Sequence, residues 1–242
     1  MNLPPPNLDP ALFAATDLEL HFPARAFGQQ PVRALAGVTF SIFPGETVAL
    51  VGESGCGKTT LLHCLFGLLT PTSGSVRFRG QEISALRGAA ERRFRRQAQL
   101  VFQDAGAALN PRLRMREAIS EPLLAHGLLA RDAAHCRAQE LLDMVEIPRR
   151  EHEALPSQLS EGQRHRVVLA RALALAPVFL AADEPLSSLD VLTKSRMLDL
   201  LLRLREQQRL TMLIVSHDLA LVRQFCTRTL VMAAGRLVTA QP

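Results

Sequence analysis

The chain has 242 residues, enough for one large domain or for a core with an inserted subdomain, and its composition gives no sign of disorder. The formal net charge is +5, and nearly all of the 28 basic residues are arginine, since lysine occurs only at Lys58 and Lys194. Tryptophan and tyrosine are absent, so few aromatic side chains could stack on bases, which speaks against a nucleic-acid-binding protein. The densest basic run, Arg92 to Arg96, indicates a solvated face or a contact with an acidic partner rather than a nucleic-acid footprint.

The cysteines and the apolar segments indicate the compartment. The four cysteines form no close pair such as Cys-x-x-Cys, so zinc and redox motifs find no support, and scattered thiols fit a reducing environment. The N-terminal residues are broken by prolines and lack a basic region, unlike a signal peptide. The most apolar region, 167–182, is interrupted by Arg171 and Pro177 and is not expected to span a bilayer. We expect a cytosolic protein whose membrane contact comes through a partner.

The hydrophobic patterns predict an alternating α/β fold. After a flexible lead-in over residues 1–15, alternating or continuous apolar runs predict strands over 17–22, 38–43, 47–51, 75–79, 99–102, 178–182, 211–215, 229–232 and 237–238. Helices are predicted after residue 60 and over 133–145, 163–176, 191–208 and 218–226. The strand at 75–79 is expected at a sheet edge with its arginines in water. Residues 115–150 show no strand-like run and predict an inserted helical block, with breaks at Pro122 and Gly127. Strands alternating with helices imply a mainly parallel sheet with ligands at the carboxyl ends of its strands.

The stretch from Gly52 to Thr60 follows a buried strand and precedes a helix, which is the context of a phosphate-binding P-loop. Its glycines allow successive N–H groups to point at phosphate oxygens, and the helix N-terminus adds the positive end of its dipole. Lys58 is expected to reach the β- and γ-phosphates, and the Thr59 hydroxyl to ligate Mg²⁺. The nucleotide-binding residues predicted in the loop are Gly52, Ser54, Gly55, Cys56, Gly57, Lys58, Thr59 and Thr60.

Two carboxylates, Asp183 and Glu184, end the buried strand 178–182, where they need a charge partner. Mg²⁺ bound to a nucleotide would supply it, with Asp183 as a metal ligand and Glu184 as the catalytic base. A simple helix N-cap is disfavoured because a proline follows at once. Gln103 ends another strand and is predicted to reach the metal or the attacking water. His217 also follows a buried strand and is predicted to contact the γ-phosphate, although a structural histidine is the alternative.

A second anion site is predicted at Ser160 and Gly162, immediately before a helix, because a hydroxyl donor and an unobstructed N–H suit an anion there. The helical block separates this stretch from Gln103 along the chain. Such a site has an obvious use if it meets the P-loop of another chain.

These elements together resemble the ATPase subunit of an ABC transporter over essentially the whole chain. The family's motifs are matched in order by Walker A (52–60), the Q-loop glutamine (Gln103), the signature Leu-Ser-Glu-Gly-Gln (159–163), Walker B (178–183), the D-loop (187–190) and the switch histidine (His217). The resemblance implies a P-loop NTPase fold with an antiparallel β subdomain: a core over 16–104 and 177–242, and a helical subdomain over 105–176. It also implies ATP and Mg²⁺ as cofactors and Gln163 as a nucleotide contact. Phe22 stands where the family places an adenine-stacking aromatic; a core role for Phe22, or Phe27 in its place, is the alternative.

Within the family, the segments 101–112, 121–124 and 216–226 resemble the ATPases of dipeptide, oligopeptide and nickel importers. Ala105 and Ala108 depart from the Pro and Ser usual in that group, which puts the details of transporter contact in doubt. Glu161 replaces a Gly of the usual signature. The chain stops at Pro242 without the longer C-terminal tail common among peptide importers, and this slightly favours the expectation of a nickel or metallophore importer.

The resemblance implies a dimer of two cassettes, each clamping ATP between one P-loop and the partner's signature. The partner would be identical or, as is common in this group, a related second ATPase. Permease subunits in the membrane, and indirectly an extracytoplasmic binding protein, would complete an importer at the cytoplasmic face, without nucleic acid. Two other classes are a soluble ABC-type ATPase of DNA repair or translation, supported only by the basic charge, and a nucleotide sensor without hydrolysis, disfavoured by Glu184 and His217.

Overall fold

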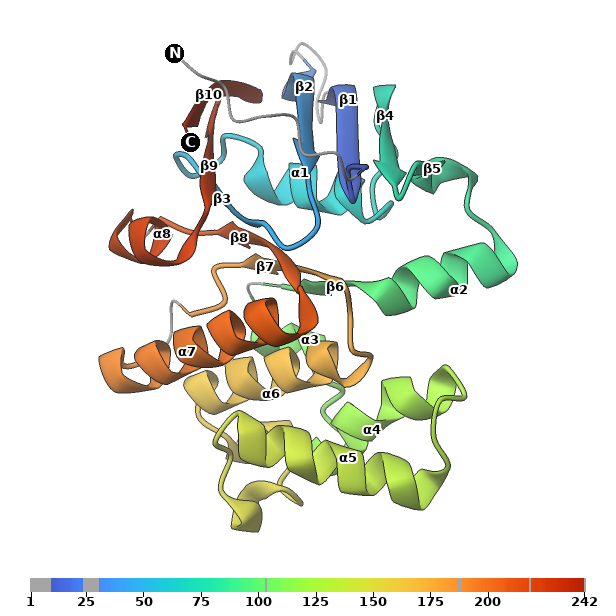
Figure 1. Ribbon diagram of the computed structural model, residues 1–242, viewed down its shortest axis with the longest axis vertical. Coiled ribbons are helices and arrows are strands. Elements are labelled where there is room, and N and C mark those ends of the chain that lie inside the picture. The colour runs from blue at the N-terminus through green and yellow to red at the C-terminus, as the bar shows by residue number, and fades with distance from the viewer. Residues whose placement is uncertain (1–9, 24–30, 103, 187–188, 218, 242) are drawn as a thin grey trace. The chain divides into compact units, whose positions relative to one another are not determined.

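The computed structural model describes residues 10–23, 31–102, 104–186, 189–217 and 219–241 (Figure 1). The chain divides into two compact units, one formed by residues 1–91 with 211–242 and the other by residues 92–210. The functional division into a core and a helical subdomain at 105–176 remains a prediction.

The first unit contains an antiparallel sheet in the order β2-β1-β4-β5 (Figure 1). Its strands are β1 (Phe13–Phe22), β2 (Val32–Ile42), β4 (Ser73–Phe78) and β5 (Gln81–Glu82), followed by a 3₁₀ turn at Ile83–Ala85. Phe13 is fully buried and packs on the rings of Phe66 and Phe78, with centroids 6.3 and 5.0 Å away. The flexible lead-in predicted to reach residue 15 is therefore wrong from Phe13 onward. The edge position predicted for 75–79 is also wrong, because β5 pairs with β4 on the side away from β1.

The first unit also holds four strands in the order β10-β9-β3-β8, in which β3 pairs in parallel with both of its neighbours. The elements here are β3 (Thr47–Val51), α1 (Lys58–Leu65), β8 (Thr211–Val215), α8 (Leu219–Phe225), β9 (Arg228–Ala233) and β10 (Arg236–Gln241). All five residues of β3 are buried, as are all five of β8. A strand flanked on both edges and covered on both faces is a rigid support for the loop that follows it. The predicted mainly parallel core is confirmed around β3.

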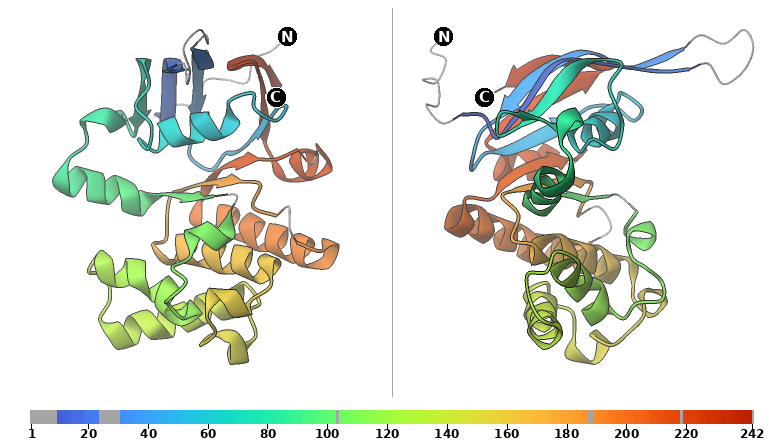
Figure 2. Two further views of the ribbon diagram at one scale, coloured as in Figure 1. Left: turned by 180° about the vertical axis from the view of Figure 1, so that it is seen from behind. Right: turned by 90° about the vertical axis from the view of Figure 1, so that its right-hand side faces the viewer.

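The second unit combines a parallel strand pair with helices (Figure 2). Its elements are β6 (Ala98–Val101), α3 (Ala105–Ala108), α4 (Met115–Ala125), α5 (Arg131–Met144), α6 (Glu161–Ala174), β7 (Phe179–Asp183), α7 (Val191–Gln208) and 3₁₀ turns at Arg149–Glu151 and Pro156–Gln158. Helices α4, α5 and α6 pack on one another. Pro122 lies inside α4 and not at a break, whereas Gly127, with a φ of 65°, follows the end of that helix as predicted.

Helix α2 (Gly88–Gln97) runs across the boundary between the units and carries the arginine run on its exposed side, with Phe94 buried on the other. The solvated face predicted for Arg92 to Arg96 is confirmed for Arg92, Arg93 and Arg96, which are exposed. Among the described residues, no helix is long and apolar enough to cross a membrane.

Candidate functional site

The loop after β3 has the backbone that a phosphate cradle needs. Gly55 and Gly57 have φ values of 78° and 111°, which only glycine adopts without strain. A Cβ on Gly57 would lie 2.5 Å from the Ala34 carbonyl oxygen, and one on Gly52 would lie 2.2 Å from that of Met232. The loop therefore passes against neighbouring backbone at two points where no side chain fits. The close approach to backbone and the positive φ angles both agree with the glycine pattern of the sequence.

Lys58 lies at the first position of α1 and turns its ammonium back into the loop. Its Nζ donates to the carbonyl oxygens of Gly52 and Glu53, each at 2.7 Å, and lies 3.8 Å from the Cys56 sulfur. The loop is held from its other side by Gly235 N, which donates to Cys56 O at 3.0 Å. The ammonium is thus held by the loop that the sequence predicts will wrap phosphate.

Helix α1 opens directly from this loop. Its first backbone hydrogen bond runs from Leu61 N to Gly57 O at 2.9 Å, so the amides of the first turn precede the helical ladder. No acidic residue lies in that turn. Ser54 and Thr59 are exposed and Thr60 is half-buried, whereas Cys56 is buried. A helix N-terminus with positive dipole and without a competing carboxylate is suited to an anion.

The sheet brings His217 to the same edge as the P-loop. Leu50 of β3 pairs with Val215 of β8, and Ser216 N donates to Leu50 O at 3.4 Å. Because β3 and β8 run in parallel, the exposed His217 and the loop beginning at Gly52 both follow the carboxyl ends of adjacent strands.

Phe22 ends β1 with 39% of its surface exposed. The alternative that it is a core residue is therefore wrong. The other alternative, Phe27, lies outside the described residues.

The predicted metal ligand and base lie in the second unit, at the end of β7. Asp183 is the last residue of this strand and is 6% exposed. Glu184 follows with a φ of 50°, in the left-handed region that a non-glycine residue adopts only at a cost of about 1–3 kcal/mol. Six other non-glycine residues among those described share a positive φ, so this backbone does not by itself mark Glu184 as functional. Val101 of β6 pairs with Ala182 of β7. The predicted Gln103 follows β6 and lies outside the described residues.

The signature stretch forms the N-terminus of α6. Ser160 is the N-cap: its Oγ accepts from Gln163 N at 3.2 Å, and Gln163 Oε1 accepts from Ser160 N at 2.9 Å. This reciprocal pair is a capping box. Ser160 is exposed and Gly162 half-buried.

Two residues that support this helix start, Arg166 within α6 and Glu151 before it, were not predicted from the sequence. Arg166 Nη1 donates to the carbonyl oxygens of Val145 and Glu146, at 3.0 and 2.7 Å, and Gln163 Nε2 donates to the Glu151 carboxylate. Burial lowers the pKa of Arg166, while the carboxylates of Glu146, Asp190 and Glu151 oppose this shift. Their sequence spacing follows no motif, so no local signal marks these contacts.

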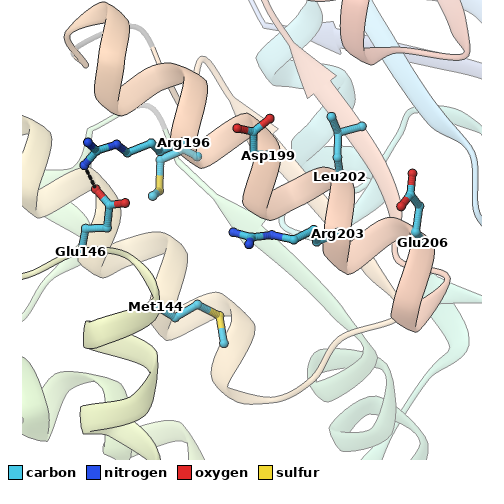
Figure 3. A pocket seen from close by; sticks show the side chains of 8 residues that line it. Met144, Glu146, Arg196, Asp199, Leu202, Arg203 and Glu206 are labelled. Carbon is cyan, nitrogen blue, oxygen red and sulfur yellow. Dashed lines mark hydrogen bonds and ion pairs between the residues drawn. The ribbon is translucent and has the colours of Figure 1, made fainter.

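A groove of about 390 Å³ lies along α7, lined by Met144, Glu146, Arg196, Met197, Asp199, Leu202, Arg203 and Glu206 (Figure 3). Arg196 Nη1 donates to Glu146 Oε2 at 2.9 Å across one end. None of the predicted nucleotide residues lines this groove, so the candidate site rests on the loops described above and not on the groove.

The comparisons with known proteins agree with these motifs. The family described as ABC transporter matches residues 35–187. The chain is 42% identical, over 94% of its length and 69% of the relative's, to the putative oligopeptide transport ATP-binding protein YkfD of Bacillus subtilis. It is 45% identical to the nickel import ATP-binding protein NikE of Brucella abortus, over 84% of this chain and 77% of that protein.

Other relatives are longer. The chain is 44% identical to the oligopeptide transport ATP-binding protein OppD of Mycobacterium bovis over 88% of its own length, but spans only 34% of that protein. None of these names supports the alternative of DNA repair or translation.

Among solved structures, the chain is similar to the ATP-binding cassette MJ0796, seen as a dimer in a post-hydrolysis state with ADP and phosphate. The TM-score is 0.86 at 30% identity, covering 95% of this chain and 97% of that one. The predicted fold class is therefore confirmed. With its P-loop, strand-end carboxylates and capped signature helix, the chain belongs to the ABC transporter family, as one of its ATP-binding ATPase cassettes.

Proposed function

We propose that this chain hydrolyses ATP at a site formed by its P-loop, and that a dimer of cassettes uses the hydrolysis to power an importer. The observation that carries the proposal is the loop from Gly52 to Lys58. Its glycines have positive φ, Gly52 and Gly57 lie against neighbouring backbone, and the loop opens into a helix whose first turn has no acidic residue. Few functions other than wrapping a polyphosphate need that combination.

The first-turn amides of α1 and the Lys58 ammonium would bind the β- and γ-phosphates, and the exposed Phe22 would stack on the adenine. The remaining loop residues, Ser54, Gly55, Cys56 and Thr60, would line the phosphate path. Multiple N–H donors in fixed positions stabilise the charge that moves onto the leaving oxygen during transfer.

A magnesium ion shared with the nucleotide would complete the proposed site. Among the described residues, no three His, Cys, Asp or Glu side chains gather to hold a metal by themselves. A hydroxyl at Thr59 and a carboxylate at Asp183, with Gln103 in addition, suit Mg²⁺, which keeps much of its shell for phosphate and water. When bound, the ion would neutralise charge on the β- and γ-phosphates.

Glu184 would accept the proton of the attacking water, and His217 would donate a hydrogen bond to the γ-phosphate. The position of Glu184 directly after the buried Asp183, at the carboxyl end of β7, supports this assignment.

The dimer would complete each site with Ser160, Gly162 and Gln163 of the partner cassette. One support is the similar cassette, which is described as dimeric. Another is a pair of exposed apolar residues that follow Asp190: Val191 is 86% exposed and Leu192 is 61% exposed. Adjacent apolar side chains with that exposure favour a surface that is covered in an assembly.

The relatives named above are peptide and nickel transport proteins, which favours a peptide, nickel or metal-chelate cargo. The cassette would sit on permease subunits at the cytoplasmic face of the membrane, with an extracytoplasmic binding protein delivering cargo. The second cassette would be identical or, by the importer resemblance, a related ATPase.

The experiment that tests the function compares the wild-type chain with Glu184→Gln, using ATP and Mg²⁺. Wild type should release phosphate, and chelation of the metal should stop it. Glu184→Gln should bind ATP as wild type does and lose at least about 100-fold in turnover, since a general base contributes 10²–10⁴-fold. Glu140→Gln, an equal charge change at an exposed position of α5, should behave as wild type. Near-normal hydrolysis by Glu184→Gln would refute its role, and no phosphate release by wild type would refute the function.

A further inference from the structure

The Gln163 side chain uses both ends of its amide. Oε1 accepts from Ser160 N at 2.9 Å, and Nε2 donates to Glu151 Oε2. Glu151 comes from the 3₁₀ turn at Arg149–Glu151, which lies twelve residues earlier in the chain and outside the signature motif. The signature cap is therefore tied to an acidic residue that the motif does not include.

The chemistry of the two contacts fixes which way the amide points. An ionised carboxylate only accepts hydrogen bonds, so the amide end that faces Glu151 must be the NH₂ group. This leaves the carbonyl oxygen to face the N–H of Ser160. A flipped amide would set an oxygen against the carboxylate and NH₂ against the Ser160 donor, losing both bonds. Glu151 thus selects the only amide orientation that completes the capping box.

Glu151 itself stands on a segment held at several points. The Arg149 guanidinium pairs with the Asp143 carboxylate at 2.9 Å, and this bond lowers the pKa of Asp143. The buried His152 ring lies 3.0 Å from the carbonyl oxygen of Ile147. Arg116 N donates to His152 O at 3.0 Å, which joins the segment to the first turn of α4. The Glu151 carboxylate is therefore held in place before any nucleotide binds, and it can orient the Gln163 amide without having to be ordered by binding.

We propose that Glu151 is a positioning residue for the signature site. It holds Gln163 in the orientation that caps α6 and so presents the Ser160 hydroxyl and the first-turn amides. The inference rests on the proposed function, in which this helix N-terminus binds the nucleotide held by a partner cassette. The Ser160 oxygen accepts from Gln163 N, so its own hydrogen is left to donate outward. Without Glu151 the amide is free to rotate, and the Ser160 N–H then loses its acceptor, which loosens the N-cap residue and with it the hydroxyl that accepts from Gln163 N.

The test uses the full chain, ATP and Mg²⁺, with two readouts. The first is phosphate release, separated into KM and kcat. The second is hydrogen exchange of the amides around Ser160, which needs no turnover. Glu151→Ala should lower kcat by about tenfold, the effect of one lost charge-assisted hydrogen bond, and should speed exchange at the signature. Affinity of the P-loop for a fluorescent ATP analogue should stay within about twofold of wild type, because the Glu151 carboxylate contacts Gln163 and Arg150, which are not residues of that loop.

The acid two residues on provides the matched control. Glu153→Ala removes an equal charge from the same segment, where the side chain pairs with Arg116 at 2.9 Å. It should leave kcat and exchange at the signature as in wild type. Glu151→Gln can still present an amide oxygen to Gln163 and should recover most of the turnover lost in Glu151→Ala.

An exchange of the two residues keeps the test valid if Glu151→Ala folds poorly. Gln163→Glu alone sets two carboxylates face to face and should speed hydrogen exchange at the signature at least as much as Glu151→Ala. Combining it with Glu151→Gln restores a carboxylate and an amide in contact and should slow that exchange again; turnover is not compared in these two variants, because Gln163 is itself a proposed nucleotide contact. Unchanged kcat and exchange in Glu151→Ala, or no return of slow exchange in the exchanged pair, would overturn the inference. Loss of phosphate release by wild type would overturn the proposed function instead, while the exchange data would still decide whether Glu151 holds the cap.

Discussion

A single methyl group added at Gly57 should damage the phosphate loop more than one added two residues earlier. Both Gly55 and Gly57 have positive φ, at 78° and 111°, so alanine at either position is strained. They differ in their surroundings. A Cβ at Gly55 meets nothing within 4 Å, whereas one at Gly57 would lie 2.5 Å from the Ala34 carbonyl oxygen, which cannot swing away as a side chain could.

The left-handed backbone costs about 1–2 kcal/mol in each variant. Overpacking adds about 1–3 kcal/mol in Gly57→Ala alone. Urea unfolding should therefore show a free energy of unfolding about 1–3 kcal/mol lower for Gly57→Ala than for Gly55→Ala. With a slope of about 1–3 kcal/mol per molar urea, the midpoints should differ by roughly 1 M. ATP titration should show the larger loss of affinity for Gly57→Ala, because the loop must move away from Ala34.

Equal midpoints for the two variants would refute the reasoning, since strain alone would then explain both. Greater damage in Gly55→Ala would refute it more strongly.

Four further predictions concern side chains of the same chain. Lys58→Ala should lower ATP affinity at least about tenfold, because a charge-assisted contact to phosphate is lost; a titration with unchanged affinity would count against its role. Alkylation should reach the exposed Cys136 quickly and the buried Cys64 slowly, since burial raises the pKa of Cys64 to about 11, and mass spectrometry of the labelled protein measures both. Chain labelled at Cys56 should fail to bind ATP, and full binding by it would contradict this reading of the loop. Burial lowers the pKa of His165 below 6.5, against the opposing charge of Glu161 and Asp104 and with the help of Arg164. As the pH falls, the unfolded chain therefore takes up the proton before the folded chain does. Wild type should lose stability relative to His165→Gln as the pH falls from about 7.5 to about 5.5. An equal difference between the urea midpoints of the two proteins at both pH values would exclude this.

The P-loop and its strand were predictable because their signals are local. Five consecutive apolar residues, a glycine pattern and a helix start follow one another without a gap, and each requires the next. The same holds for α7, whose predicted range of 191–208 matches the observed helix, since Asp190 caps it with a hydrogen bond from Thr193 N at 3.0 Å.

The start of β1 was not predictable, because its evidence is not local. Phe13 follows a run of prolines that suggests a flexible segment, and its burial depends on the rings of Phe66 and Phe78, far along the chain. Tertiary packing decides such a position, and one window of sequence does not contain it. Helix α2 escaped prediction for a related reason: four arginines in five residues hide the single buried Phe94.

The residues that support the signature helix were likewise only partly predictable from the sequence. Ser160 and Gln163 satisfy a sequence rule for helix starts, so the cap could be read directly. Glu151 and Arg166 act through contacts with residues at spacings that belong to no motif. A fold is needed before such residues can be given a role.

The return of the Lys58 ammonium to its own loop has a consequence for the thermodynamics of nucleotide binding. A segment with three glycines among six residues would lose much conformational entropy if a ligand had to order it. Here two carbonyl oxygens already hold the ammonium at 2.7 Å, so that entropy is lost when the chain folds. Binding then becomes an exchange of acceptors, carbonyl for phosphate, on a preformed frame. Calorimetry should accordingly find a small heat-capacity change for the phosphate part of the nucleotide.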